Sequence, residues 1–182
     1  MIQEHIGNLF ELIPLETENP KLIPHVCNDI HVIGGGFTGP LIKKWPEVKE
    51  IYNSYPNLYL GAMQLVKVKP QKSPRYQIEG QTYLSGPNYQ NVWVCNMISQ
   101  SGIIGPDNPK PIKYVALVRA MEEVARTAHH LRRNYFSDKP AKVEIWAPRF
   151  GSDLAGGNWN FIVELIDEIW GEFDVHICKL EK

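Results

Sequence analysis

The sequence predicts an α/β protein whose mixed, mostly parallel sheet is covered by helices on both faces. Short apolar segments that suit strands alternate with segments in which apolar residues recur every three or four positions. Two strand-like segments run into glycine-rich turns that lead directly into a helix. Hydrophobic residues make up 43% of the chain, enough to bury a core between such layers. In a sheet of this kind, ligands are expected at the carboxyl ends of the strands.

The individual elements follow from periodicity and from the positions of glycine and proline. The expected strands fall at residues 2–6, 22–27, 60–68, 92–98, 142–146 and 175–180. The expected helices fall at residues 37–45, 46–55, 112–134 and 159–173. Pro46 suits the first turn of the second helix, where its missing N–H would be unpaired anyway. Residues 70–87 suit a loop or irregular hairpin, and residues 102–111 suit a long surface connection that could cover a ligand.

Size and charge narrow the class of protein. A chain of 182 residues has the size of one domain, so we expect a single domain over residues 1–182. Its formal net charge of -1 offers no general attraction to duplex nucleic acid or to an anionic membrane, and neither is expected as a partner. The three cysteines lie in apolar segments and suit reduced core thiols. With neither a signal-peptide pattern nor a membrane-spanning apolar run, the expected location is the cytoplasm.

Two glycine-rich turns are the best candidates for a binding site. The first contains Gly34, Gly35 and Gly36 and follows the strand-like segment at residues 22–27. Glycine lets the backbone approach a phosphate closely, and the following helix offers free N–H groups and the positive end of its dipole. The second turn, within residues 147–159, repeats the order of strand, glycines and helix. If the two strands are neighbours, both turns meet at one crevice and can hold a diphosphate.

The glycine run also has an interpretation without a ligand, and the sequence lacks the motifs of several other kinds of site. Three consecutive glycines equally suit a tight turn without a ligand, in a chain that serves as an interaction scaffold. The sequence has neither a GxxxxGK[ST] motif nor the GxGxxG spacing of dinucleotide sites. It also lacks CxxC, HExxH, EF-hand and GxSxG patterns, so we expect no metal and no cofactor. The five tryptophans lie in expected strands or helices and suit core packing.

Five motifs occur in a recognisable order. They are GNLF at residues 7–10, HVCND at 25–29, GGGF at 34–37, CNMISQSG at 95–102 and PRFGSDLAGGNW at 148–159. Together they resemble the macro domain family, most closely its branch of ADP-ribose 1''-phosphate phosphatases and small ADP-ribosyl hydrolases. The resemblance implies a three-layer α/β/α sandwich with a sheet of six or seven strands. It also implies ADP-ribose or a derivative as ligand or substrate, with an ADP-ribosylated protein as a further partner.

The same resemblance implies which positions contact the ligand. Asn8 and Leu9 would lie near the adenine. The amide oxygen of Asn8 can accept a hydrogen bond from the adenine amino group. The implied positions near the distal ribose are His25, Asn28 and Asp29. Those of the first phosphate loop are Ile33, Gly34, Gly35, Gly36 and Phe37. Those of the second are Gly151, Ser152, Asp153 and Leu154, with Phe150 beside the ribose or the adenine.

Two reactions are compatible with the resemblance. In the first, water attacks a phosphate monoester on the distal ribose, with His25 or Asp29 as general base and loop N–H groups stabilising the developing charge. In the second, a lysine and an aspartate assist cleavage of an ADP-ribosyl ester, but the matching segments read NMISQ and LAGG and lack this pair. A 1''-phosphate phosphatase or a non-catalytic ADP-ribose reader is therefore favoured, and an ADP-ribosyl hydrolase that acts without this pair is a further alternative. Within its apolar strand, His25 equally suits a core histidine.

Asp153 departs from the family pattern. Relatives commonly have glycine at this position, and a carboxylate close to two phosphates repels them. Asp153 either points to solvent or acts on a ligand hydroxyl or a water.

Overall fold

A computed structural model of the protein describes residues 2–17, 19–69, 75–78, 81–84, 91–134 and 142–180. Six strands form one sheet in the order β1-β8-β7-β2-β6-β3. Their bounds are Ile2–Ile6 (β1), Lys21–Asn28 (β2), Met63–Lys67 (β3), Val92–Gln100 (β6), Glu144–Pro148 (β7) and Asp174–Lys179 (β8). Neighbouring strands are parallel except β3 and β6, which are antiparallel. The sheet is thus mixed and mostly parallel, as the sequence predicts.

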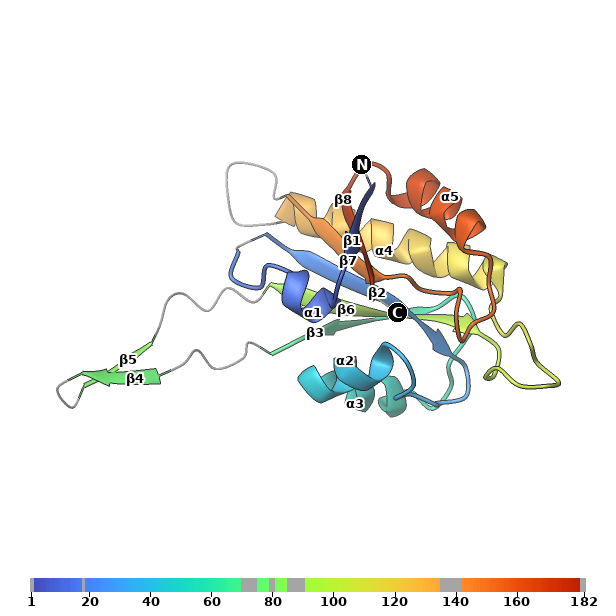
Figure 1. The fold of residues 1–182 in the computed structure, drawn as a ribbon, viewed down its shortest axis with the longest axis horizontal. Coiled ribbons are helices and arrows are strands. Elements are labelled where there is room, and N and C mark those ends of the chain that lie inside the picture. Colours follow the sequence, from blue (N-terminus) through green and yellow to red (C-terminus); the bar gives the residue numbers. More distant parts are fainter. Residues whose placement is uncertain are drawn as a thin grey trace.

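Helices cover both faces of this sheet (Figure 1). On one face lie α4 (Tyr114–Asn134) and α5 (Trp159–Trp170). On the other lie α1 (Leu9–Leu12), α2 (Thr38–Lys44) and α3 (Glu47–Ser54). The architecture is therefore the expected three-layer α/β/α sandwich.

The core has one main cluster on each face of the sheet. Leu117 and Ile166 from the long helices pack in the same cluster as Leu22 of β2. Trp45, which follows α2, packs on the other face in the cluster of Ile23, the next residue of β2. Successive residues of a strand point to opposite faces, so a strand covered on both sides is apolar at nearly every position. This is why β2 appears in the sequence as a continuous apolar run.

The expected elements form close to their expected positions, with one addition. The short helix α1 was not expected, because four residues are too few to show a helical period. Its start is marked by Asn8, whose Oδ1 accepts a hydrogen bond of 3.1 Å from the backbone N–H of Phe10. This is an N-cap, a signal that can be read from the sequence only once a helix is suspected.

The long insertion between β3 and β6 contains a second, two-stranded sheet. β4 (Arg75–Ile78) and β5 (Gln81–Leu84) pair antiparallel, within the range where a loop or irregular hairpin was expected. The other residues of 70–87 lie outside the described part of the chain.

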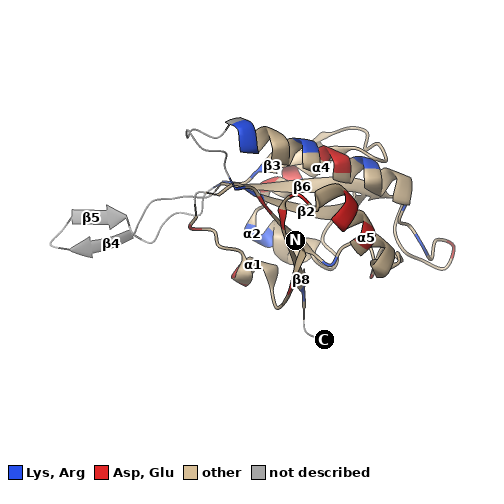
Figure 2. Ribbon diagram, turned by 90° about the horizontal axis from the view of Figure 1, so that it is seen from above, with Lys and Arg blue, Asp and Glu red and all other residues tan. Residues whose placement is uncertain are grey.

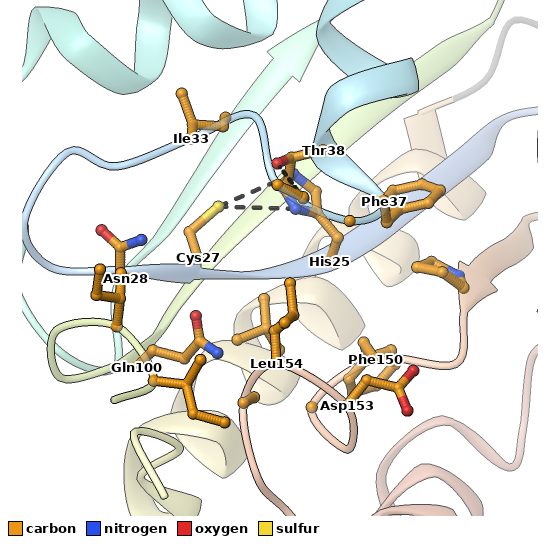
Figure 3. A pocket seen from close by; sticks show the side chains of 18 of the residues that line it. His25, Cys27, Asn28, Ile33, Phe37, Thr38, Gln100, Phe150, Asp153 and Leu154 are labelled. Carbon is orange, nitrogen blue, oxygen red and sulfur yellow. Dashed lines mark hydrogen bonds between the residues drawn. The ribbon is translucent and has the colours of Figure 1, made fainter. Parts of the chain in front are cut away.

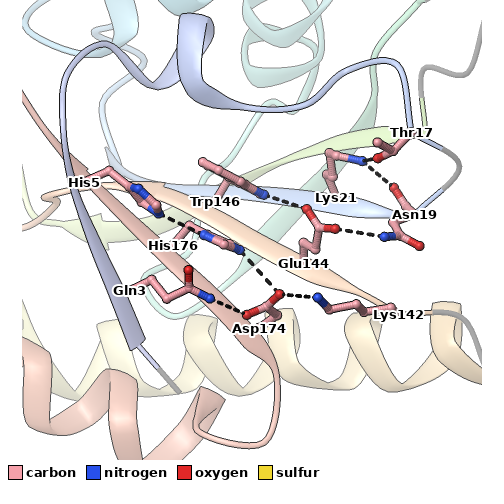
Figure 4. A network of polar contacts seen from close by, with 10 residues as sticks. All are labelled: Gln3, His5, Thr17, Asn19, Lys21, Lys142, Glu144, Trp146, Asp174 and His176. Atoms are coloured by element: carbon pink, nitrogen blue, oxygen red, sulfur yellow. Dashed lines mark hydrogen bonds and ion pairs between the residues drawn. The ribbon is translucent and has the colours of Figure 1, made fainter.

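A polar network crosses the start of β2, β7 and β8 (Figure 4). Glu144 of β7 accepts hydrogen bonds from the Asn19 side chain and from the Trp146 indole, both at 2.9 Å. His176 of β8 stacks on Trp146 at 4.0 Å between ring centroids, and its Nδ1 lies 2.9 Å from His5 Nε2. Burial lowers the pKa of His176. These polar groups thus satisfy one another beneath the N-terminal strand.

The charged residues show no single dominant sign. Figure 2 shows Lys or Arg and Asp or Glu mixed along α4. In the described residues, none of the helices has both the length and the apolar character needed to cross a membrane.

Candidate functional site

The two glycine-rich loops meet at the carboxyl ends of adjacent strands. β2, which precedes the first loop, pairs in parallel with β7, which precedes the second. Gly35, Gly36, Gly151 and Leu154 line one cavity of about 250 Å³ between them. Figure 3 shows Leu154 among the side chains around this cavity. A Cβ atom added to Gly36 would lie 3.2 Å from Leu154 Cδ1, so the two loops touch. The two strands are therefore neighbours, and the two loops converge on one cavity.

The first loop is held by its own backbone and by Thr38. Gly34 and Gly36 have φ angles of 128° and 54°, which side chains rarely allow. The Thr38 hydroxyl accepts from the N–H of Gly34 at 2.9 Å and donates to the carbonyl of Gly35 at 2.8 Å. The N–H of Gly34 is therefore occupied, and Gly34 is not among the cavity-lining residues, unlike Ile33, Gly35, Gly36 and Phe37.

The second loop needs glycine for a different reason. Gly151 has φ 75°, and its carbonyl accepts from the N–H of Gly157 at 2.9 Å. A Cβ at Gly157 would lie 2.3 Å from that carbonyl oxygen, and one at Gly156 would lie 2.5 Å from the carbonyl oxygen of Pro109. The LAGG segment thus packs tightly against Gly151 and against the 102–111 connection.

Both loops carry backbone N–H groups that no described acceptor uses. In the first loop these belong to Gly35, Gly36 and Phe37. In the second they belong to the residues from Gly151 to Leu154. Successive free N–H groups in such turns form anion-binding concavities. The site can therefore solvate an anion with backbone donors.

His25 lies at the floor of the first cavity and is only 2% exposed. Its Nε2 lies 2.7 Å from Asn96 Oδ1, and Asn96 Nδ2 donates to Gln64 Oε1 at 3.1 Å. Because the Asn96 amide is oriented by Gln64, the hydrogen-bond network assigns the proton of His25 to Nε2. Burial lowers the pKa of His25 to about 4, so the ring is neutral at pH 7. Its Nδ1 faces the thiol of Cys27, 3.7 Å away.

Asn28 and Asp29 organise loops. Asn28 lines the first cavity, but its Oδ1 accepts from the backbone N–H groups of Ile30 and Val32, each at 3.1 Å, and its Nδ2 donates to the Val32 carbonyl. One amide hydrogen of Asn28 remains for a ligand. Asp29 Oδ1 accepts from the N–H of Gly102 at 2.8 Å, and Asp29 is outside the lining of both described cavities. The structure does not bring Asp29 together with His25.

A second cavity of about 790 Å³ adjoins the first. Asn8 and Leu9 line it, as do Ser152 and Trp159. The Asn8 amide is oriented by the N-cap bond and by a hydrogen bond of 3.1 Å from its Nδ2 to Glu11. Residues shared by the two cavities are Gly36, Phe37, Pro148, Arg149 and Asp153. The two cavities therefore form a continuous crevice.

The side chains of the second loop take different positions. Phe150 is buried and lines the first cavity while packing against Trp170 at 5.8 Å. Leu154 is 56% exposed and lies over the glycines of the first loop. Asp153 is exposed at the junction of the two cavities, which agrees with the solvent-facing alternative.

Several lining residues were not anticipated from the sequence. Arg149 lies at the junction of the cavities, and Ile103 and Ile104 bring the 102–111 connection to the first cavity. Trp159 packs against the main core cluster, as expected for the tryptophans, and it also lines the second cavity, which was not expected. Its place in the first turn of α5, directly after the LAGG segment, was the available signal. Among the described residues, no group of three or more histidine, cysteine or carboxylate side chains could hold a metal ion.

Comparison with solved structures decides the fold. A protein of Bacteroides thetaiotaomicron is 28% identical, with a TM-score of 0.71, covering 98% of this chain and 99% of its own. A macrodomain protein of Streptomyces coelicolor is 25% identical, with a TM-score of 0.66 and 98% of both chains covered. This chain has the macrodomain fold.

A more distant macrodomain-fold neighbour carries a ligand. The structure of Thermosipho africanus DarTG in complex with ADP-ribose is 14% identical to this chain, with a TM-score of 0.62. The match covers 97% of this chain and 41% of that one. No family model matches the sequence.

Proposed function

We propose that this chain binds ADP-ribose in the crevice, with the diphosphate on the two glycine-rich loops. The observation that carries the proposal is the cavity shared by Gly35 and Gly151, in which both loops supply free backbone N–H groups. Such donors solvate an anion without needing a positively charged side chain. The macrodomain fold and the ADP-ribose complex of the Thermosipho africanus protein support this choice of anion.

The two cavities suit the two ends of such a ligand. The adenosine occupies the second cavity beside Asn8 and Leu9, and the distal ribose occupies the first beside Asn28. The diphosphate lies between them, at Gly36 and Phe37, which line both cavities. In this arrangement the anionic diphosphate lies where the free backbone N–H groups are, and the adenine lies in the larger cavity.

The reaction proposed for this site is removal of a 1''-phosphate from the distal ribose. His25 is the candidate proton acceptor, because its neutral ring lines the first cavity and its unprotonated Nδ1 has only a long contact of 3.7 Å with the Cys27 thiol, which a water can replace. Asp29 takes a supporting role, anchoring the 28–32 turn to the chain at Gly102. The lone pair on Nδ1 accepts a proton from the water as the water oxygen bonds to phosphorus and the bond between phosphorus and the ribose O1'' breaks. The protonated ring then returns the proton to O1'', and loop N–H groups stabilise the phosphoryl oxygens throughout.

A second candidate function is binding without turnover. The observation that favours it is the pKa of His25, which burial lowers to about 4 and which makes the ring a weak base. The carboxylate of Asp29 is engaged in a structural hydrogen bond. A reader of free or protein-linked ADP-ribose needs neither group to transfer a proton.

Calorimetry and a turnover assay on three compounds test these proposals. The compounds are ADP-ribose, ADP-ribose 1''-phosphate and an ADP-ribosylated peptide. We expect heat of binding with ADP-ribose, and phosphate release from the 1''-phosphate that His25→Gln lowers by about 100-fold or more. Asp29→Ala is expected to reduce binding and turnover together, because it removes the oxygen that accepts from the N–H of Gly102 and so loosens the turn.

Each outcome has one interpretation. Absence of both heat and thermal stabilisation with millimolar ADP-ribose would reject the binding proposal. Binding without phosphate release by the unaltered protein would establish the reader in place of the phosphatase. Phosphate release that His25→Gln leaves unchanged would remove His25 from the mechanism.

A further inference from the structure

Arg149 occupies the junction of the two cavities. It is the only lysine or arginine among the described residues that line the first cavity, and it also lines the second. Its backbone is fixed at the end of β7, where its N–H donates to the carbonyl of Cys178 at 3.0 Å. A long cationic side chain is thus anchored at the boundary between the two glycine-rich loops and the larger cavity.

The guanidinium is held by an aromatic platform. Arg149 Cζ lies 4.9 Å from the ring centroid of Trp159, in the first turn of α5. Stacking on an indole orients the planar guanidinium and leaves its edge N–H groups for a ligand. Trp159 is itself fixed by an edge contact with Phe150 at 6.3 Å between ring centroids. The side chain is therefore preorganised before a ligand binds.

The polar atoms of this side chain lack an acceptor. Arg149 Nε is buried and has no hydrogen-bond partner, and no ion pair joins the guanidinium to a carboxylate among the described residues. Asp153 lines the same two cavities without pairing with it. A buried donor without an acceptor costs free energy that a bound anion would recover.

We propose that Arg149, oriented by Trp159, binds a phosphate of the ligand's diphosphate and offsets the carboxylate of Asp153. This rests on the proposed function. The backbone N–H groups of the loops supply shape and hydrogen bonds, whereas Arg149 supplies the positive charge of the first cavity. A macrodomain loop with aspartate at position 153 would otherwise repel a dianionic diphosphate. Arg149 therefore sets the preference of this chain for ligands with charged phosphates.

Calorimetry with ADP-ribose tests this in five variants. Arg149→Gln is expected to weaken binding by about 10- to 100-fold, the loss that follows from one charge-assisted hydrogen bond. Arg149→Lys should recover only part of the lost affinity, because an ammonium group is not planar and cannot make a bidentate hydrogen bond to a phosphate. Trp159→Phe should stay closer to the unaltered protein than Trp159→Leu, since only the former retains an aromatic face. Arg133→Gln, at the exposed end of α4, removes the same charge and should change affinity less than twofold.

The salt dependence of binding separates charge from packing. Raising the salt concentration should weaken binding to the unaltered protein more steeply than to Arg149→Gln, because the lost contact is electrostatic. Thermal unfolding of each variant checks that the fold is retained. Equal affinity of Arg149→Gln and the unaltered protein would overturn the role of Arg149 while leaving ADP-ribose binding intact. An unaltered protein that does not bind ADP-ribose would instead overturn the function on which this inference rests.

Discussion

At the scale of single residues, the imidazole of His25 shows how burial and hydrogen bonding define a chemical state. Gln64 orients the amide of Asn96, and the amide oxygen then accepts the Nε2 proton of His25. Burial opposes a second proton more strongly than this hydrogen bond favours it, and the pKa falls to about 4. The sequence left open whether His25 is a core residue or a site residue. The structure shows a buried histidine that also lines the first cavity.

The low pKa of His25 makes folding depend on pH. Between pH 4 and 6.5 the unfolded chain binds the proton and the folded chain does not, so stability rises with pH and is lost as pH falls through this window. The slope from this one group is about 1.4 kcal/mol per pH unit, or about 3 kcal/mol over the window. In His25→Gln the new amide can still donate to Asn96, but it does not titrate. We therefore expect this variant to lose less unfolding free energy between pH 6.5 and pH 4, by about 3 kcal/mol.

Urea unfolding of both proteins from pH 7 down to pH 4 measures this slope. Burial also lowers the pKa of His176, so the variant should keep a smaller slope of the same sign. Parallel curves for the two proteins would show that His25 titrates alike in the folded and unfolded chains.

At the scale of elements, two strand–turn–helix units build the crevice with different turn chemistry. In the first, Thr38 ties the glycine run to the start of α2. In the second, Gly157 packs so close to Gly151 that a side chain would collide with a backbone oxygen. Neither α2 nor α5 needs a charged residue at its start to form these turns. The seven-residue α2 contributes mainly by ending the turn, and the free N–H groups belong to the loops themselves.

Gly36→Ala tests the first turn. Gly36 has φ 54°, a left-handed conformation that costs alanine about 1–2 kcal/mol, and its new Cβ would press on Leu154 at 3.2 Å. We expect a loss of unfolding free energy of this size and weaker ADP-ribose binding. Gly105→Ala is the matched control, because nothing lies within 4 Å of its added Cβ. If thermal unfolding and calorimetry gave the same result for both variants, the turn would not have the strict conformation described.

At the scale of the whole molecule, the crevice exists because the strand order places β7 beside β2. The two loops are far apart in the chain, because the first precedes the long helix α4 and the second follows it. A ligand that contacts both loops therefore links two distant parts of the sequence. Such a ligand stabilises the native state by mass action, by about 3 kcal/mol at a hundredfold excess over its Kd.

Amide hydrogen exchange should report this joint contact. With ADP-ribose present, we expect added protection at Gly35–Phe37 and at Gly151–Leu154 together, because both sets of free N–H groups face one anion. The edge strand β3 serves as the internal reference, since it lies at the far edge of the sheet from β1 and contributes no residue to either described cavity. Protection confined to one loop would contradict a diphosphate held between the two.

The sequence by itself determined the class of fold, most of the elements and both glycine-rich loops. These depend on local rules: apolar period, turn residues and the conformational freedom of glycine. The positions of Asn8, Asn28 and Leu154 at the crevice were implied by the resemblance to the macro domain family. The catalytic roles proposed for His25 and Asp29 depend on the hydrogen bonds that each side chain makes, and the sequence does not specify these bonds.

Only the tertiary structure decided how these parts combine. That β2 and β7 are neighbours is a property of the strand order, and it brings Gly36 against Leu154. The stack of Arg149 on Trp159 joins a strand end to a helix start across the LAGG segment. The position of the His25 proton on Nε2 depends on Asn96 and Gln64 from two other strands, and the neutral state of the ring depends on its burial. Each depends on contacts between distant residues, which periodicity and spacing cannot specify.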